Sequence, residues 1–147
     1  MIPDTASYDF VASPLGRALE TMDIVRAAMG LAPGGYRIDE RLLELTFGAW
    51  EGSTLEQLRL TEPALVADRE LDKWGFVPPG GESYRMLSDR VRGWLDELKR
   101  PTVAVAHGGV GRVLLGLIGA LEPNVIVNMD FYQDRILVFE RGTVRWL

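Results

Sequence analysis

The chain has 147 residues, of which 47% are hydrophobic and 25% are charged. This length predicts one domain over residues 1–147 with its own hydrophobic core, and the composition excludes a disordered or fibrous protein. The formal net charge of −5 argues against nucleic acid or an anionic membrane as the main partner, because both require a basic surface.

The residue counts also exclude several kinds of site. There is no cysteine and a single histidine, His107, so disulfides, thiolate metal sites and multi-histidine metal centres are ruled out. Residues 1–5 lack the basic start of a signal peptide, and the longest apolar segment, residues 110–121, is too short to span a bilayer. We therefore expect a cytoplasmic protein without a metal or a cofactor.

The first half of the chain predicts short elements separated by loops. Residues 8–12 are rich in strand-forming residues and predict a β-strand. A helix follows over residues 15–29, and Gly30 stands in the position of a C-cap glycine. A second short strand is predicted over residues 41–45. A helix should begin at residues 53–56, whose Ser-x-x-Glu pattern is that of a capping box.

The second half alternates helices and strands. After a helix that begins near residues 61–63, an amphipathic helix is predicted over residues 82–99. Its buried stripe is expected to consist of Leu87, Val91, Trp94, Leu95 and Leu98, and its solvated side of Glu82, Asp89, Arg90, Arg92, Asp96 and Glu97. The apolar residues 102–106 predict a strand covered on both faces. A helix over residues 110–121 and a hairpin around Arg141 and Gly142 complete a layered α/β pattern.

His107 is the strongest local signal for a functional site. It directly follows the apolar strand, and in open α/β sheets ligands bind beyond the carboxyl ends of the strands. Gly108 and Gly109 let a ligand approach the backbone, and the N-terminus of the next helix favours an anion. The alternative is a core histidine that caps this helix. A dinucleotide-binding fingerprint is disfavoured, because Leu114 stands where its third glycine is required.

Arg17 and Glu44 are further candidates. Arg17 falls in the first turn of a helix, where its charge opposes the helix dipole but its planar fork suits a phosphate; a solvated surface arginine explains it equally well. Glu44 is predicted at a strand end among apolar residues, where partial burial would raise its pKa and suit it to donate a proton; a surface glutamate is the alternative. Glu51 and Glu82 are explained by loop hydrogen bonding and helix capping. Asp130, Tyr132 and Gln133 precede the hairpin and are candidates to line a pocket.

Four runs in this order resemble the histidine phosphatase superfamily, which includes cofactor-dependent phosphoglycerate mutases and broad-specificity phosphatases. They are residues 13–21, residues 43–44 with 47–52, residues 79–83 (Pro-Gly-Gly-Glu-Ser) and residues 106–110 (Ala-His-Gly-Gly-Val). One such run is a weak signal, whereas four in sequence are a strong one. The resemblance implies a phosphoglycerate-mutase-like, three-layer α/β/α sandwich with a mostly parallel sheet and a C-terminal hairpin.

The resemblance also implies roles for individual residues. Arg17 matches the arginine that clamps the phosphoryl oxygens, Glu44 the acid that protonates the leaving oxygen, and His107 the histidine that donates to the phosphoryl group. Residues expected to bind the substrate or shape its pocket are Ser13, Gly108, Gly109 and Glu82. The family uses no metal. The expected partner is a small phosphorylated metabolite, and a homo-oligomer is compatible with the sequence.

The sequence departs from the family pattern at its start. Family members begin with a strand ending in Arg-His-Gly, whose histidine becomes phosphorylated, and this chain opens at the strand that follows. We therefore expect an N-terminally incomplete domain without the nucleophile and one phosphate-binding arginine, and an unpaired edge on the strand at residues 102–106. A late start of the sequence and a degenerate, non-catalytic paralogue both explain this, and the retained Arg17, Glu44 and His107 favour the late start.

The leading functional hypothesis is a phosphomonoester hydrolase that works through phosphohistidine when complete, with the present chain inactive or impaired. The short segment between Gly52 and Pro78 resembles the compact phosphatases. A non-catalytic domain that binds a phosphorylated ligand is the alternative from another class. A phosphoglycerate mutase, or a form that uses His107 as a substitute nucleophile, are further alternatives.

Overall fold

The computed structural model describes residues 5–140 and 142–147 and contains two sheets. Residues 1–4 and Arg141 lie outside the described residues. The prediction that the start of the chain is not a signal peptide falls on the first, and the predicted hairpin turn falls on the second. A three-stranded parallel sheet has the order β2-β1-β3, made by Arg37–Ile38, Asp9–Ala12 and Thr102–Val105. The antiparallel hairpin consists of β4 (Leu137–Glu140) and β5 (Thr143–Trp146), which confirms its prediction.

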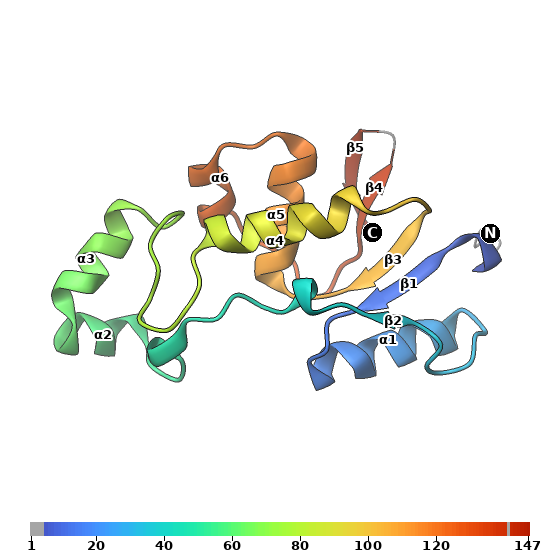
Figure 1. Ribbon diagram of the computed structural model, residues 1–147, viewed down its shortest axis with the longest axis horizontal. Helices are drawn as coiled ribbons and strands as arrows, with labels where there is room; N and C mark the ends of the chain where they lie inside the picture. Colours follow the sequence, from blue (N-terminus) through green and yellow to red (C-terminus); the bar gives the residue numbers. More distant parts are fainter. Residues whose placement is uncertain (1–4, 141) are drawn as a thin grey trace.

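Helices cover both faces of the parallel sheet, so the predicted three-layer arrangement is confirmed (Figure 1). Side chains alternate between the two faces of a strand. Phe10 and Ala12 of β1 pack with Met22 of α1 (Gly16–Ala28) on one face. Val11 packs on the other face against α4 (Tyr84–Asp96) and α5 (Gly108–Gly119). Burial of apolar side chains on both faces therefore fixes the sheet between the helices.

The amphipathic helix α4 follows its sequence pattern except at two charged residues, and Asp89, Arg92, Asp96 and Glu97 are exposed as predicted. Ser83 caps it by accepting a hydrogen bond from the N–H of Met86, and Leu87, Val91 and Trp94 are buried as predicted. The prediction that Glu82 and Arg90 are solvated is wrong. Their side chains are only 13% and 23% exposed and form an ion pair. Arg90 lies three residues after Leu87 and four before Trp94, so helical geometry places it at the edge of the buried stripe.

The strand predicted over residues 41–45 is wrong. A 3₁₀ helix (Glu40–Leu42) occupies its start, because Asp39 caps the turn by accepting the N–H of Arg41. Strand β2 instead lies just before this turn, where Ile38 pairs with Ala12. Glu44 therefore does not lie at a strand end but in an irregular segment.

The strand β3 is less covered than predicted. Val103 and Val105 are half-buried and Ala104 is exposed, so the expectation of burial on both faces is wrong. Within residues 5–140 and 142–147, β3 pairs with β1 alone, and its other edge has no strand neighbour. This is the unpaired edge that the sequence predicts, and it explains the exposure.

Helices α2 (Leu55–Thr61) and α3 (Pro63–Leu71) lie at one end of the molecule, and α6 (Pro123–Asn128) lies beside α5 (Figure 1). Helix α2 starts with a capping box of Thr54 and Gln57, one residue later than predicted, and α3 starts at its proline as predicted. Both pack around Trp50 in a small separate cluster. The short α6 was not predicted. In the part of the chain that the structure describes, no helix has the length and hydropathy to cross a membrane.

The packing of α4 gives a first test of the fold. Leu87 is fully buried in the main core, so Leu87→Ala should lower the free energy of unfolding by about 2–5 kcal/mol through lost contacts and a cavity. The matched control is Leu60→Ala in α2, because Leu60 is 82% exposed; it should cost less than about 0.5 kcal/mol. Urea denaturation measures both, and equal losses would contradict the assignment of this core.

Candidate active site

The carboxyl ends of β1 and β3 lie side by side at one edge of the sheet. Ala12 pairs with Val105, so the residues that follow, Ser13 and His107, leave the sheet together. The Nε2 atom of His107 lies 2.7 Å from the Oγ atom of Ser13, which is fully buried. The N–H of Ser13 also donates to the carbonyl of Val105. Ser13 thereby fixes the orientation of the imidazole ring.

His107 does not act as a helix cap. It occupies the N-cap position of α5, but its side chain makes no capping hydrogen bond and is half-buried. Its Nε2 atom is held by Ser13 instead. The alternative of a capping core histidine is therefore not supported, and the ring remains beside the N-terminus of the helix.

Glu44 reaches the same helix N-terminus. Its Oε1 atom accepts hydrogen bonds from the N–H of Leu45 at 2.9 Å and the N–H of Gly109 at 3.1 Å. A Cβ atom at position 109 would collide with Oε1, so the close approach requires glycine there. The sequence suggested that the N–H groups at the start of α5 bind a ligand anion. The N–H of Gly109 instead binds the carboxylate of Glu44, which is stabilised by the helix N-terminus.

Arg90, which the sequence analysis missed as a site residue, holds the segment that carries Glu44. Its Nη1 and Nη2 atoms donate to the carbonyls of Arg41 at 2.6 Å and Leu43 at 2.8 Å. The same guanidinium pairs with both carboxylate oxygens of Glu82, at 2.7 and 2.8 Å. The sequence signal for the burial of Arg90 was its position beside the buried stripe of α4. Glu82 therefore acts here through Arg90.

Arg17 lies in the first turn of α1 and is exposed. Among the described residues it forms no salt bridge. Its charge acts on His107: the pKa of His107 is lowered chiefly by burial, raised by the carboxylate of Glu44, and lowered by the positive charges of Arg17 and Arg90. Arg17 and Glu44 therefore both lie within electrostatic reach of His107.

The segment before the hairpin contributes one side chain to this edge. A Cβ atom at Gly108 would stand 2.9 Å from the Nε2 atom of Gln133, so Gln133 lies over the start of α5. Tyr132 instead packs edge-on against Trp146 of the hairpin. Asp130 makes no hydrogen bond or ion pair within the residues that the structure describes. These residues likewise contain no group of three His, Cys, Asp or Glu side chains placed to hold a metal.

Comparison with known proteins identifies the class. The sequence model of the histidine phosphatase superfamily (branch 1) matches residues 3–146, and the chain belongs to this superfamily, as its motifs predict. A glucosyl-3-phosphoglycerate phosphatase of Mycobacterium tuberculosis is 37% identical over 114 residues, which cover 68% of this chain and 49% of that protein. A bifunctional protein of the same organism is 41% identical over 88 residues, which cover 60% of this chain and 23% of that protein. The match thus spans half or less of the length of these relatives.

Solved structures agree with this assignment. The mycobacterial glucosyl-3-phosphoglycerate phosphatase in complex with inorganic phosphate has a TM-score of 0.71 and 29% identity, covering 95% of this chain and 73% of that one. The α-ribazole phosphatase from Shigella flexneri has a TM-score of 0.77 at 20% identity, covering 95% and 71%. The second likeness supports the fold alone. The phosphoglycerate-mutase-like fold is confirmed.

The lowered pKa of His107 predicts how stability depends on pH. Its folded pKa lies below the ordinary value of 6.5, so the unfolded chain binds the proton more readily. His107 therefore contributes stability above pH 6.5 that is lost as the pH falls through its folded pKa. Urea denaturation between about pH 7.5 and about pH 5 should show this loss, and His107→Asn should reduce it. An identical pH slope in the variant would contradict the prediction.

The role of Arg90 predicts a second effect. Arg90→Met leaves Glu82 and the carbonyls of Arg41 and Leu43 without their donor, and should lower the free energy of unfolding by about 3 kcal/mol. It should also shift the amide resonance of Gly109, because Glu44 loses its support. Arg92→Met, at an exposed position of the same helix, is the control. A Gly109 resonance that stays in place in folded Arg90→Met would refute the positioning role.

Proposed function

We propose that Ser13, Arg17, Glu44 and His107 form a phosphoryl-binding rim and that the protein containing this domain is a phosphomonoester hydrolase. One observation carries the proposal: an exposed arginine without an ion-pair partner among the described residues shares an edge with a half-buried histidine oriented by Ser13. An arginine held near a helix N-terminus against the dipole is explained by an anionic ligand. The phosphatases among the relatives support the reaction class.

The residues divide the chemistry between them. Arg17 offers a planar fork that pairs with two phosphoryl oxygens. His107 donates a hydrogen bond from its ring to a third oxygen and stabilises the charge of the transition state. Glu44 protonates the oxygen of the leaving alcohol as the ester P–O bond breaks. Gly108 is the first residue of α5, a position whose N–H suits an anion. Residues 1–147 act as one domain in this proposal, with Arg90 and Glu82 holding Glu44 in place.

A phosphohistidine mechanism requires a histidine that attacks the phosphorus atom. A phosphohistidine route forms a P–N bond as the ester bond breaks, and water then attacks phosphorus to release phosphate. His107 is the only histidine in the 147 residues, and its Nε2 atom is engaged by Ser13. A route through another histidine requires residues outside this sequence. We propose that the chain as given binds phosphate esters but hydrolyses them weakly or not at all.

The substrate class follows from the relatives by analogy. A small phosphorylated metabolite, such as a phosphorylated glycerate or sugar derivative, suits a rim whose Arg17 has no salt-bridge partner among the described residues. The engagement of His107 by Ser13 favours a second candidate, a domain that binds a phosphorylated ligand without turnover.

The test compares this chain with a version extended by the residues that its reading frame encodes upstream. The extended protein should hydrolyse p-nitrophenyl phosphate, and Arg17→Met or His107→Ala should each lower its kcat/KM by about 10²–10³-fold. Arg92→Met should retain full activity. Acid-labile phosphate trapped on His107 of the present chain would show the substitute-nucleophile route.

The alternative outcomes are distinct. Saturable phosphate binding without turnover in the extended protein would identify the binding domain. Turnover that survives both Arg17→Met and His107→Ala would overturn the proposed rim.

A further inference from the structure

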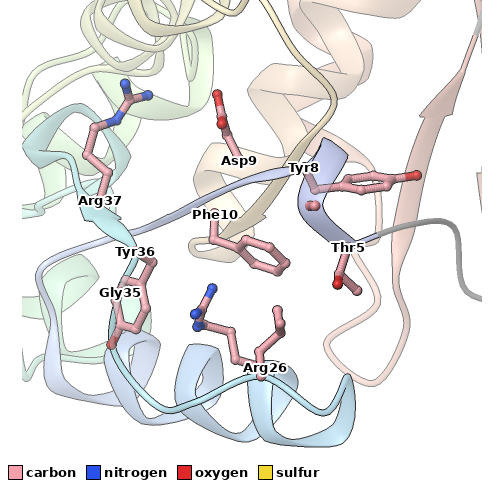
Figure 2. A pocket seen from close by; sticks show the side chains of 10 residues that line it. Thr5, Tyr8, Asp9, Phe10, Arg26, Gly35, Tyr36 and Arg37 are labelled. Carbon is pink, nitrogen blue, oxygen red and sulfur yellow. The ribbon is translucent and has the colours of Figure 1, made fainter.

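A pocket lies beside the start of β1 (Figure 2), whereas His107 follows the end of the paired strand β3. The volume of this pocket is about 490 Å³, within the range of small-molecule sites. It lies where β1 begins and α1 ends, and the loop before β2 closes one side. Its principal side chains are those of Thr5, Tyr8, Phe10, Arg26, Leu31 and Tyr36. Three of these side chains are aromatic, and one, Arg26, is a buried cation.

Arg26 is the unusual member of this set. It is only 9% exposed, and its guanidinium carbon lies 4.8 Å from the centroid of the Phe10 ring. Its Nε atom donates to the carbonyl of Ala32 at 3.0 Å. No carboxylate within residues 5–140 and 142–147 lies at ion-pair distance, and neither Nη group has a hydrogen-bond partner there. A buried charge with open donors results.

Packing does not explain this arrangement. Arginine is almost never buried unless it is paired, because an uncompensated charge is costly to desolvate. The C-terminal end of α1 and the ring of Phe10 offset part of that cost. Neither uses the Nη donors, and a methionine would fill the same space without the charge. Outward-facing Nη groups of a guanidinium are the donors that bind a carboxylate or phosphate in pairs.

The other charged groups of the pocket do not compete for Arg26. Asp9 and Arg37 also line it, but Figure 2 shows their side chains pointing away from Arg26. Asp9 is paired with Arg100 at 3.2 Å. The nearest acid on the same helix, Asp23, accepts the N–H of Gly34. Of the two arginines that line the cavity, Arg26 is thus the one that points toward the aromatic side chains.

We propose that this pocket binds a small molecule with one anionic group, a carboxylate or a phosphate, attached to an apolar or aromatic body. The anion pairs with the Nη atoms of Arg26, and the body contacts Phe10, Tyr8 and Tyr36. Arg17 and Arg26 lie at opposite ends of α1, about 14 Å apart along its axis. The two anion sites are therefore separate, and this one does not depend on the proposed phosphatase activity.

The test uses the full chain labelled with ¹⁵N and titrated with benzoate and, separately, with phenylphosphonate. Amides of Phe10, Gly35 and Tyr36 report on this pocket, and the amides of Gly108 and Gly109 report on the His107 rim. At least one of the two probes should shift the pocket amides to saturation, and the probe that does so identifies the anion. Arg26→Met should weaken that binding at least about tenfold. The matched control Arg37→Met, on the same pocket wall but turned away, should bind normally.

A second variant keeps the proposal testable if Arg26→Met unfolds. Leu31→Trp retains the arginine and fills the cavity, and it should abolish the pocket shifts. His107→Ala should remove shifts at the rim alone. Pocket amides that do not move with either probe at millimolar concentrations, or that saturate equally in folded Arg26→Met, would overturn the proposal. The proposal would also be overturned if Arg37→Met weakened binding as much as Arg26→Met does.

Discussion

The parallel pairing of β1 with β3 is the constraint on which the site depends. Parallel strands end at the same edge of a sheet, so the register that pairs Ala12 with Val105 also delivers Ser13 and His107 to one place. The residues are 94 positions apart, yet their side chains lie 2.7 Å from each other. The helices that follow both strands then begin at this edge, which brings Arg17 and the N–H of Gly109 to it. The first turn of each helix is thereby part of the proposed rim.

The position of Glu44 depends on a different device. The segment that carries it is irregular and pairs with no strand among the described residues. The side chain of Arg90 therefore supplies the donors that a neighbouring strand would otherwise provide. The ion pair with Glu82 compensates the half-buried charge of that arginine. Such a pair adds little net stability by itself, but breaking it leaves a buried charge alone. The proposed site thus depends on the polar network of Arg90 and Glu82 as well as on the pairing of β1 with β3.

The sequence predicted the regular parts of this structure because their residues repeat with the period of one element. The amphipathic stripe of α4 and the glycine at the end of α1 are local signals: Gly30 has a φ of +75°, and the N–H of Leu31 donates to the carbonyl of Arg26. The strand at residues 41–45 was mispredicted because its backbone carbonyls accept hydrogen bonds from the side chain of Arg90, 46 to 49 residues further along the chain, and not from another strand. The burial of Arg26 and Arg90 was missed although each stands at helical spacing from a buried residue, Arg26 four residues after Met22 and Arg90 three after Leu87. The reason is that charged side chains are expected to be solvated.

The electrostatic coupling of His107 to Arg17 and Glu44 is the most direct test of the account. His107 is the only histidine, so its ring protons give a single set of NMR signals whose titration midpoint can be followed without assignment. The midpoint should lie below 6.5; Arg17→Met should raise it, and Glu44→Gln should lower it. Arg92→Met should leave it unchanged. A midpoint that responds to neither Arg17→Met nor Glu44→Gln would place these side chains apart and contradict a shared rim.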